Sequence, residues 1–358
     1  MADLEQRIDA LLEATENWLN KDNDYLSVAY DQTVREDYFS FEDVKHALLS
    51  IKNAVNESSI RGWVDRAELS DESDASGNNV LCLHAGNIPL VGFQNALATI
   101  LSGATYYGKI SRKDPYLLPT FLNEVKKTDA FSSVDLQWVH NLEHFEGLKS
   151  DAVLFAGSER SVPGVKHSIQ KYNIANRNTK YLIRTAHFSM ACLDDPSPET
   201  INNLVEGIFR YGGKGCRSVA LVVAPFGLDE ISNELEESVH SFWEESPQHK
   251  KPGPKLKHRQ AYNKAVEQTQ LWLEDFLIQE GGLEFDQDFI CYWIEGDKHQ
   301  AAELAEQFGE QHQSIYITNP DTKIPGFGDR TEHLENAQQP PINWKPDGVD
   351  TIEWLINC

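Results

Sequence analysis

The sequence predicts an α/β protein built on a mainly parallel sheet. From Val80 onward, short apolar runs typical of buried strands alternate with amphipathic segments that have the spacing of helices. Such alternation places successive strands side by side in the same direction, with helices covering the faces of the sheet. The chain of 358 residues, 40% of them hydrophobic, is long enough for two or three domains with sizeable cores.

The region before this alternation is predicted to be helical. Apolar residues recur at helical spacing over residues 4–19, and Ser40 with Asp43 forms a helix-start signal ahead of a second apolar run. The polar segment 66–79 offers few side chains that a core could bury, so we expect an exposed loop and a domain boundary there. The sequence thus predicts an N-terminal helical region over residues 1–66.

The alternating part begins directly after that loop. A strand is expected at Val80 to Leu83, a helix near Leu90 to Leu101 and a second strand at Thr105 to Ile110. The next helix is expected to be capped by Asp114, with Pro115 at its first position. Further strands are expected at residues 152–155, 181–183, 189–193, 219–223, 289–294 and 314–317.

The net charge disfavours several classes of partner. The chain holds 32 Lys and Arg against 56 Asp and Glu, a formal charge of -24, which argues against nucleic acid and anionic membranes as main partners. Its start lacks the basic and apolar regions of a signal peptide, and no apolar run has the length of a membrane span. We therefore expect a cytoplasmic protein without a membrane span.

Three stretches carry weaker signals. The segment 207–216, "GIFRYGGKGC", approaches a phosphate-binding loop, but a glycine stands where the lysine belongs and no Ser or Thr follows Lys214. The histidines of "HNLEH", residues 140–144, have the spacing of an inverted zinc motif, yet their polar surroundings favour a solvated helix face, so no metal is expected. The basic stretch 249–264 favours a solvated loop or, alternatively, an anion-binding lid over a phosphorylated substrate.

The five cysteines fall into two groups. Their spacing is irregular, so we expect reduced thiols rather than disulfides or a metal site. Cys216 lies in a glycine-rich turn between Lys214 and Arg217, whose charges would favour the thiolate that nucleophilic chemistry requires. Cys358 is the last residue. The apolar, strand-like runs that typically bury a thiol as a small hydrophobe hold Cys82, Cys192 and Cys291.

Four stretches, in this order, resemble the aldehyde dehydrogenase superfamily. They are "AGNIPL" from residue 85, "ILSGATYYGKISRKDP" from residue 100, "VLFAGSERSV" from residue 153 and "GGKGCRSV" from residue 212. In that superfamily the first two belong to the cofactor site, the third packs against the dinucleotide and the fourth carries the nucleophile. Along most of its length the chain resembles, more specifically, the LuxC-type acyl-CoA reductases, which reduce fatty acyl thioesters to aldehydes.

The resemblance implies an aldehyde dehydrogenase-like fold and a role for each matching residue. Cys216 would attack the acyl thioester, and the side-chain amide of Asn87, with a backbone N–H at Cys216, would stabilise the oxyanion. Lys109 matches the lysine that contacts the adenosine ribose, and Arg112 replaces a glutamate of NAD-preferring relatives, which favours NADPH. Judged from the residues alone, Asn87 could instead cap a helix and Lys109 could be a solvated strand end. The other cofactor-binding residues implied are Ser111, Gly157 and Ser158.

One departure from the superfamily pattern bears on the reaction. Hydrolytic members carry a glutamate that activates water, but the corresponding stretch 183–193 has no carboxylate before Asp194. We therefore expect NADPH-dependent reduction of an acyl thioester, an acyl-CoA or an acyl-protein, to an aldehyde. The alternatives are a hydrolytic NAD(P)-dependent aldehyde dehydrogenase, or a non-catalytic acyl-binding subunit of a multi-enzyme complex.

The resemblance also implies a division into domains. A Rossmann-like cofactor-binding domain is expected over residues 67–185, and an α/β catalytic domain with the nucleophilic cysteine over residues 186–335. The tail, residues 336–358, would return to the cofactor domain or form an oligomer contact. The expected partners are further copies of the chain in a homo-oligomer, or an acyltransferase or synthetase.

Overall fold

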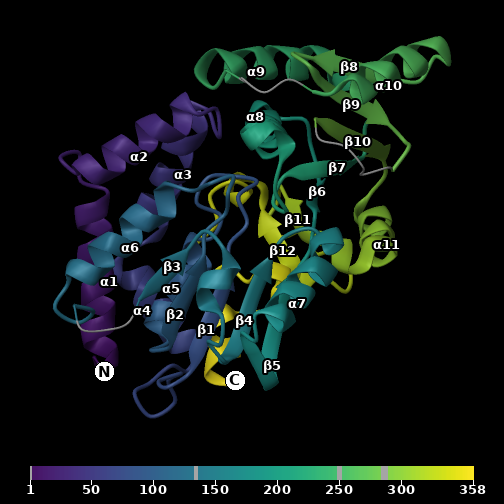
Figure 1. The fold of residues 1–358 in the computed structure, drawn as a ribbon. Coiled ribbons are helices and arrows are strands. Elements are labelled where there is room, and N and C mark those ends of the chain that lie inside the picture. The colour runs from purple at the N-terminus through teal and green to yellow at the C-terminus, as the bar shows by residue number, and fades with distance from the viewer. Residues whose placement is uncertain (1, 133–135, 248–251, 284–288) are drawn as a thin grey trace. The chain divides into compact units, whose positions relative to one another are not determined.

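The structure, a computed structural model, describes residues 2–132, 136–247, 252–283 and 289–358. The chain forms two compact units: Met1–Thr185 together with Pro341–Cys358, and Ala186–Pro340 (Figure 1). Each unit contains a mainly parallel sheet with helices packed on it, so the predicted α/β class is confirmed. In the part of the chain that is described, no helix has both the length and the apolar character needed to cross a bilayer.

The first unit contains a parallel five-stranded sheet in the order β3-β2-β1-β4-β5. Because β2 and β3 lie on one side of β1 while β4 and β5 lie on the other, the strand order reverses between β1 and β4. Its strands are β1 (Asn79–Leu83), β2 (Thr105–Lys109), β3 (Gln137–Val139), β4 (Ser150–Ala156) and β5 (Ala175–Arg184). Its helices are α1 (Leu4–Trp18), α2 (Asp24–Arg35), α3 (Phe41–Ala54), α4 (Glu57–Arg66), α5 (Phe93–Leu101), α6 (Leu117–Lys127), α7 (Val162–Lys171) and α12 (Thr351–Ile356).

Alternate residues of β1 point to opposite faces of this sheet, as the two-residue period of a strand requires. Val80 and Cys82 lie in a core shared with the N-terminal helices, whereas Leu81 and Leu83 lie in a smaller core that includes a residue of α7. Figure 1 shows α7 beside β4 and β5, and α1 beside α6. The N-terminal helices therefore share their core with the sheet.

Trp18 connects three helices of this core. Its ring stacks on Phe93 of α5 with ring centroids 5.8 Å apart, and its indole N–H donates to the Thr120 hydroxyl of α6 at 2.7 Å. A buried tryptophan combines a large apolar surface with a polar atom that needs a partner, and both requirements are met here. Since α5 follows the loop that carries Asn87, this contact anchors one end of that loop.

Two predicted helix starts have different outcomes. The Ser40 side chain caps α3 as predicted. The cap predicted at Asp114 is wrong, because α6 begins after Tyr116 and Pro115 lies ahead of its first residue. The Asp114 carboxylate accepts the N–H of Leu90 at 2.8 Å, a partner on a different segment that local sequence patterns do not indicate.

Side-chain hydrogen bonds join the C-terminal segment to the first unit. Gln94 of α5 donates to the carbonyls of Ile342 and Trp344, at 2.8 and 2.7 Å. The indole N–H of Trp63 in α4 donates to the carboxylate of Asp350, which also caps α12. These contacts join the C-terminal segment, Pro341–Cys358, to the first unit.

The second unit contains a seven-stranded sheet in the order β12-β11-β6-β7-β10-β9-β8, parallel except for the β8–β9 hairpin. All strands expected from the sequence are present, and those it missed are β3, β8, β9 and β12. The strands of this unit are β6 (Phe188–Cys192), β7 (Val219–Ala224), β8 (Gln270–Leu273), β9 (Phe276–Glu280), β10 (Ile290–Glu295), β11 (His312–Ile317) and β12 (Thr331–His333). Its helices are α8 (Pro198–Phe209), α9 (Ser232–Glu245), α10 (Pro254–Ala265) and α11 (Lys298–Phe308).

Candidate active site

One edge of the first sheet gathers most of the site residues expected from the sequence. The carboxyl ends of parallel strands meet at the same edge, and open sheets of this kind bind ligands where the strand order reverses. That reversal lies between β1 and β4, and we call the segments following β1, β2 and β4 the switch edge. It carries Asn87 after β1, Lys109, Ser111 and Arg112 at and after the end of β2, and Gly157 and Ser158 after β4.

Asn87 presents an exposed side-chain amide at the switch edge. Across the described ranges, this amide has no hydrogen-bond partner. The capping role left open by the sequence is excluded, because α5 begins at Phe93 with Gly92 as its N-cap. The Asn87 amide is therefore available to a ligand.

Lys109 and Arg112, the cations expected at the cofactor site, have few compensating partners. Lys109 is half-buried, and within the described part of the chain its ammonium has neither an ion pair nor a hydrogen bond. Burial, and then the charge of Arg112, lower the pKa of Lys109. Arg112 is exposed, and its guanidinium donates to the amide oxygen of Asn141 at 3.2 Å. Lys109 is thus more buried than a solvated strand end, and an anion bound here would offset both charges.

The remaining residues of the switch edge are closely packed or exposed. A side-chain carbon at Gly157 would lie 2.7 Å from the ring of Phe155, so this position has no room for a larger residue. Ser158 is exposed, with its hydroxyl 2.6 Å from that of Ser161 just before α7. Ser111 is 9% exposed, and its hydroxyl accepts the backbone N–H two residues further along.

Cys216 lies in a loop between α8 and β7, at the amino end of β7 in the seven-stranded sheet. The backbone of this loop is left-handed at Tyr211, Gly212, Gly213 and Gly215, with φ between 58° and 108°. Glycine adopts these angles without steric strain. A side-chain carbon at position 212 would also lie 2.9 Å from an aromatic ring of the core. The glycines therefore give the cysteine loop its path.

The two cations expected beside Cys216 both have partners within the protein. Arg217 is 7% exposed, and its guanidinium donates to both carboxylate oxygens of Glu332 and to the carbonyls of Asn336 and Ala337. Burial opposes its charge, but the neighbouring Tyr316, Glu332 and Cys216 raise the pKa of Arg217 on balance. The Lys214 ammonium lies 5.4 Å from the centroid of a phenylalanine ring. Both cations are therefore engaged with the protein itself.

The burial of the cysteines divides them as the sequence predicts. Cys216 and Cys358 are partly exposed. Burial raises the pKa of Cys82 and of Cys192 to about 12, and it raises the pKa of Cys291 further. The pKa of the Cys358 thiol is also raised, again mainly by burial. The three strand cysteines are consequently poor nucleophiles.

Comparison with protein families decides the classification. The acyl-CoA reductase (LuxC) family matches residues 3–310. The chain belongs to this family. No curated protein matches the chain significantly in sequence.

Solved structures similar to this LuxC-family chain are aldehyde dehydrogenases and related oxidoreductases. Aldehyde dehydrogenase 21 from Physcomitrella patens, solved with its reaction product succinate, has a TM-score of 0.66 at 12% identity, over 99% of this chain and 84% of its own. An oxidoreductase from Marinobacter aquaeolei has a TM-score of 0.61 at 12% identity, over 90% and 74%. Staphylococcus aureus AldH, in a substrate-bound state, has a TM-score of 0.55 at 14% identity, over 95% and 79%. The predicted aldehyde dehydrogenase-like fold is confirmed.

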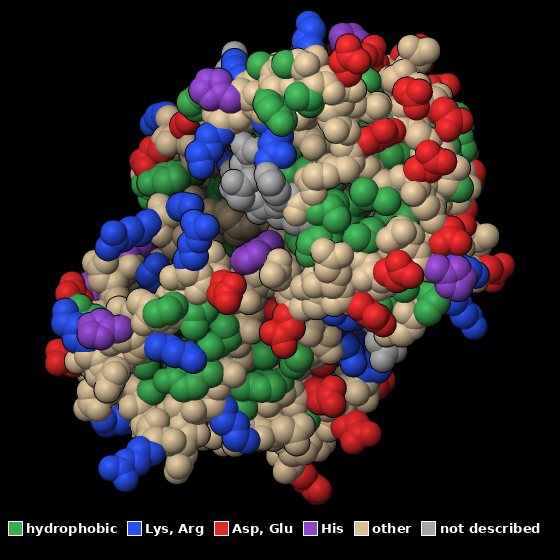
Figure 2. Space-filling view, turned by 90° about the vertical axis from the view of Figure 1, so that its right-hand side faces the viewer, with side chains coloured by type: hydrophobic (Ala, Val, Ile, Leu, Met, Phe, Trp, Pro, Cys, Tyr) green, Lys and Arg blue, Asp and Glu red, His purple; other side chains and the backbone are tan. Residues whose placement is uncertain are grey.

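Family and fold together imply reduction of an acyl group with a nicotinamide cofactor. The switch edge of this LuxC-family chain fits such a group, because the sheet order reverses there and uncompensated cations stand beside the reversal. Figure 2 shows exposed Lys and Arg side chains as well as Asp and Glu on the face it presents, so the acidic chain still carries cations at its surface. The strand order is the feature that sequence reasoning could not supply.

Asp194 is the carboxylate nearest in sequence to the position where hydrolytic relatives carry their glutamate. It follows the end of β6, whereas the Cys216 loop contacts the start of that strand. Ser189, near the start of β6, donates its hydroxyl to the carbonyl of Cys216 at 2.8 Å. Asp194 follows the other end of β6 and accepts the hydroxyls of Thr318 and Thr322. A strand rises about 3.3 Å per residue, so β6 holds Asp194 away from the cysteine loop.

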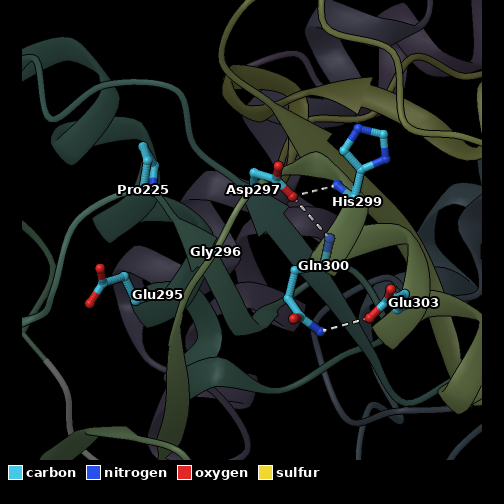
Figure 3. A pocket seen from close by; sticks show the side chains of 7 residues that line it. All are labelled: Pro225, Glu295, Gly296, Asp297, His299, Gln300 and Glu303. Carbon is cyan, nitrogen blue, oxygen red and sulfur yellow. Dashed lines mark hydrogen bonds between the residues drawn. The ribbon is translucent and has the colours of Figure 1, made fainter.

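A shallow hollow of about 450 Å³ lies at the carboxyl ends of β7 and β10 (Figure 3). It is lined by residues around the start of α11, where the Asp297 carboxylate accepts the N–H groups of His299 and Gln300. Because Cys216 precedes β7 and the hollow follows it, the length of β7 separates the two. This hollow is therefore not the reaction site of the cysteine.

The weaker sequence signals have structural explanations. His140 and His144 are exposed, and the segment between them is a short 3₁₀ turn rather than the expected helix. Among the described residues, no group of His, Cys, Asp and Glu could hold a metal ion. The basic stretch 249–264 was expected to be a loop, but from Pro254 it forms α10, while residues 249–251 lie outside the described ranges.

Proposed function

We propose that this protein reduces an acyl thioester, an acyl-CoA or an acyl-protein, to an aldehyde with NADPH, through an acyl-enzyme on Cys216. The observation that carries the proposal is the contrast between this cysteine and those in the strands. Cys216 is partly exposed in a loop whose left-handed glycines fix its path, whereas Cys82, Cys192 and Cys291 are buried with raised pKa values. A thiol that attacks a thioester must be reachable and ionisable.

In the proposed reaction the Cys216 sulfur attacks the carbonyl carbon of the thioester, and the thiol of the acyl carrier departs. The exposed Asn87 amide, with no competing partner among the described residues, supports its role as a donor to the oxyanion. Removal of one oxyanion donor typically costs about 3 kcal/mol of barrier. A nicotinamide cofactor supplies the hydride that converts the acyl group to the aldehyde oxidation state, after which the thiolate of Cys216 is released.

The preference for NADPH rests on the cations of the switch edge. Lys109 and Arg112 would contact the adenosine ribose and its 2′-phosphate, with Ser111, Gly157 and Ser158 contributing to the same site. The lowered pKa of Lys109 supports this assignment, because a bound phosphate would restore the stability of the ammonium. Charge-assisted hydrogen bonds of this kind contribute about 1.5 to 3 kcal/mol each.

Hydrolysis of the acyl-enzyme is the second candidate, and it would need a carboxylate base that the stretch 183–193 does not carry. Glu332, which pairs with the neighbour of Cys216, already accepts hydrogen bonds from Arg217 on both carboxylate oxygens. A non-catalytic acyl-binding subunit would need no dinucleotide, and the cations of the switch edge would then have no function. A cytoplasmic location and a homo-oligomer or an acyltransferase or synthetase partner fit the proposal.

The test is covalent capture of the acyl group. The protein is incubated with a panel of acyl-CoAs without cofactor, and its intact mass is measured. We expect a mass increase of one acyl group, which is lost in Cys216→Ser and retained in Cys358→Ser, the matched change at the other partly exposed cysteine. NADPH should then remove the adduct and release an aldehyde. An adduct that persists in Cys216→Ser, or one released as a carboxylic acid, would reject the proposal.

A further inference from the structure

Two loops of the switch edge are held against each other. The Asn87 loop, residues 84–92, follows β1, and the Arg112 loop, residues 110–116, follows β2. The β1–β2 pairing is continued where the N–H of His84 donates to the carbonyl of Lys109 at 3.1 Å. The side chains proposed to contact the oxyanion and the cofactor therefore come from neighbouring loops of one unit.

The first contact between these loops is a close approach at Gly86. A side-chain carbon at this position would lie 2.3 Å from the Ser111 hydroxyl and 3.1 Å from the backbone nitrogen of Asp114. Such distances leave no room for any residue other than glycine. The backbone just before Asn87 is thus pressed against the Arg112 loop.

The second contact is the carboxylate of Asp114, on the other side of Asn87. One of its oxygens accepts the N–H of Leu90 at 2.8 Å. The other is buried without a hydrogen-bond partner in the described part of the chain. Asp114 is 5% exposed, and burial raises its pKa to about 6 although the N–H groups of Leu90 and Leu117 oppose the shift. A buried carboxylate in this state carries a cost that a purely apolar contact would not.

Leu90 needs a specific restraint. Its φ is +57°, a left-handed conformation that costs a leucine roughly 1 to 2 kcal/mol. Its side chain is 4% exposed, and its carbonyl accepts the N–H of Phe93 at the start of α5. The hydrogen bond from Leu90 to Asp114 therefore fixes the residue at which the Asn87 loop turns into α5.

We propose that Asp114 is a positioning residue that holds the Asn87 loop against the Arg112 loop, so that the oxyanion donor and the cofactor-contacting side chains keep a fixed relative position. The inference rests on the proposed roles of Asn87 and Arg112 and adds a residue that touches neither substrate nor cofactor. The close approach of the Arg112 loop at Gly86 and the hydrogen bond from Leu90 to Asp114 lie on either side of Asn87.

The test is a double-mutant cycle between Asp114 and Asn87. We expect Asp114→Ala to lower kcat roughly tenfold to hundredfold with little change in KM, because a displacement of about 1 Å can cost that much. In the Asn87→Ala background the same change should cost less than about twofold, since residues acting through one another are not additive. Asp114→Asn keeps an acceptor for Leu90 and should recover most of the rate. If Asp114→Ala does not fold, Asp114→Ser takes its place, being too short to reach Leu90.

A readout independent of turnover is hydrogen exchange of the Leu90 amide. Its protection should be lost in Asp114→Ala and kept in Asp350→Ala, a matched change of another 5% exposed carboxylate in the same unit, which should lower stability but not kcat. Additive losses of kcat in the cycle, or an unchanged Leu90 amide in Asp114→Ala, would overturn the positioning role alone. Full turnover of Asn87→Ala itself would overturn the proposed role of Asn87 and, with it, this inference.

Discussion

The switch edge and the Cys216 loop both combine a candidate functional side chain with cations, but these cations differ in how many partners they have within the protein. At the switch edge, Lys109 has no partner among the described residues, and Arg112 has one hydrogen bond, to Asn141. Beside Cys216, the Arg217 guanidinium satisfies a carboxylate and two carbonyls in the interior of its unit.

The cations of the switch edge are placed to bind a ligand, whereas Arg217 stabilises the backbone segments that it contacts. A cation without a counter-ion adds little to the stability of the fold and can form an ion pair with a bound anion. A buried cation with all its acceptors in place fixes the segments that supply them, and removing it leaves an unpaired charge. Loss of a cation should therefore lower stability much more at the Cys216 loop than at the switch edge.

Loss of the Arg217 side chain should have the largest effect on stability. Arg217→Ala leaves Glu332 without its cation, and we expect the free energy of unfolding to fall by about 3 kcal/mol, measured by urea denaturation. Arg217→Met combined with Glu332→Gln removes both charges and should recover part of this loss. Arg112→Ala, the comparison at the switch edge, should stay within about 0.5 kcal/mol of the parent. Similar losses in Arg217→Ala and Arg112→Ala would mean that the two cations contribute equally to stability.

Asn87→Ala should affect turnover without affecting stability. Loss of an oxyanion donor lowers kcat roughly a hundredfold. The free energy of unfolding should change by less than about 0.5 kcal/mol, because Gly92 and not Asn87 stands at the N-cap of α5. Steady-state kinetics and urea denaturation of the same preparation separate the two effects. Normal turnover in the folded variant would assign Asn87 a role other than catalysis.

Arg112→Glu should change cofactor discrimination by about tenfold. The new carboxylate repels a 2′-phosphate but can accept hydrogen bonds from ribose hydroxyls, so the affinity for NADPH should fall more than that for NADH. Because Arg112 is exposed, added salt should also reduce the preference of the parent protein. Lys113→Glu is the matched control, the same charge change at the adjacent exposed residue, and should leave the ratio of affinities near that of the parent. Equal affinities for the two cofactors in the parent would contradict the NADPH assignment.

The cysteines should differ in their rate of alkylation. A thiol with a pKa of about 12, as in Cys82 and Cys192, is ionised to only about one part in ten thousand at pH 8. Iodoacetamide should therefore label Cys216 at least about tenfold faster than the strand cysteines, and raising the pH from 7 to 8 should leave that order unchanged. Peptide mapping by mass spectrometry measures each site. Faster labelling of a strand cysteine than of Cys216 would argue against the nucleophile.

Much of the local structure is determined by the sequence itself. Short apolar runs indicated most of the strands, the Ser40 cap began α3, and the glycines before Cys216 indicated a turn that other residues would strain. These features depend on residues a few positions apart, where backbone sterics and side-chain burial act directly. The family resemblance, carried by short motifs in a fixed order, belongs to the same level of information.

Only the tertiary structure decided which of these local features meet. It paired β1 with β4 across more than sixty intervening residues, which placed the reversal of strand order beside Asn87 and Lys109. It turned Arg217 toward Glu332 and Asp114 toward Leu90, partners that local sequence patterns do not indicate. The physical reason is that a buried charged side chain needs a hydrogen-bonding or ionic partner, and that partner can come from a segment far away in the sequence. Sequence patterns record the period of an element, whereas that partner is set by the packing of segments far apart in the chain.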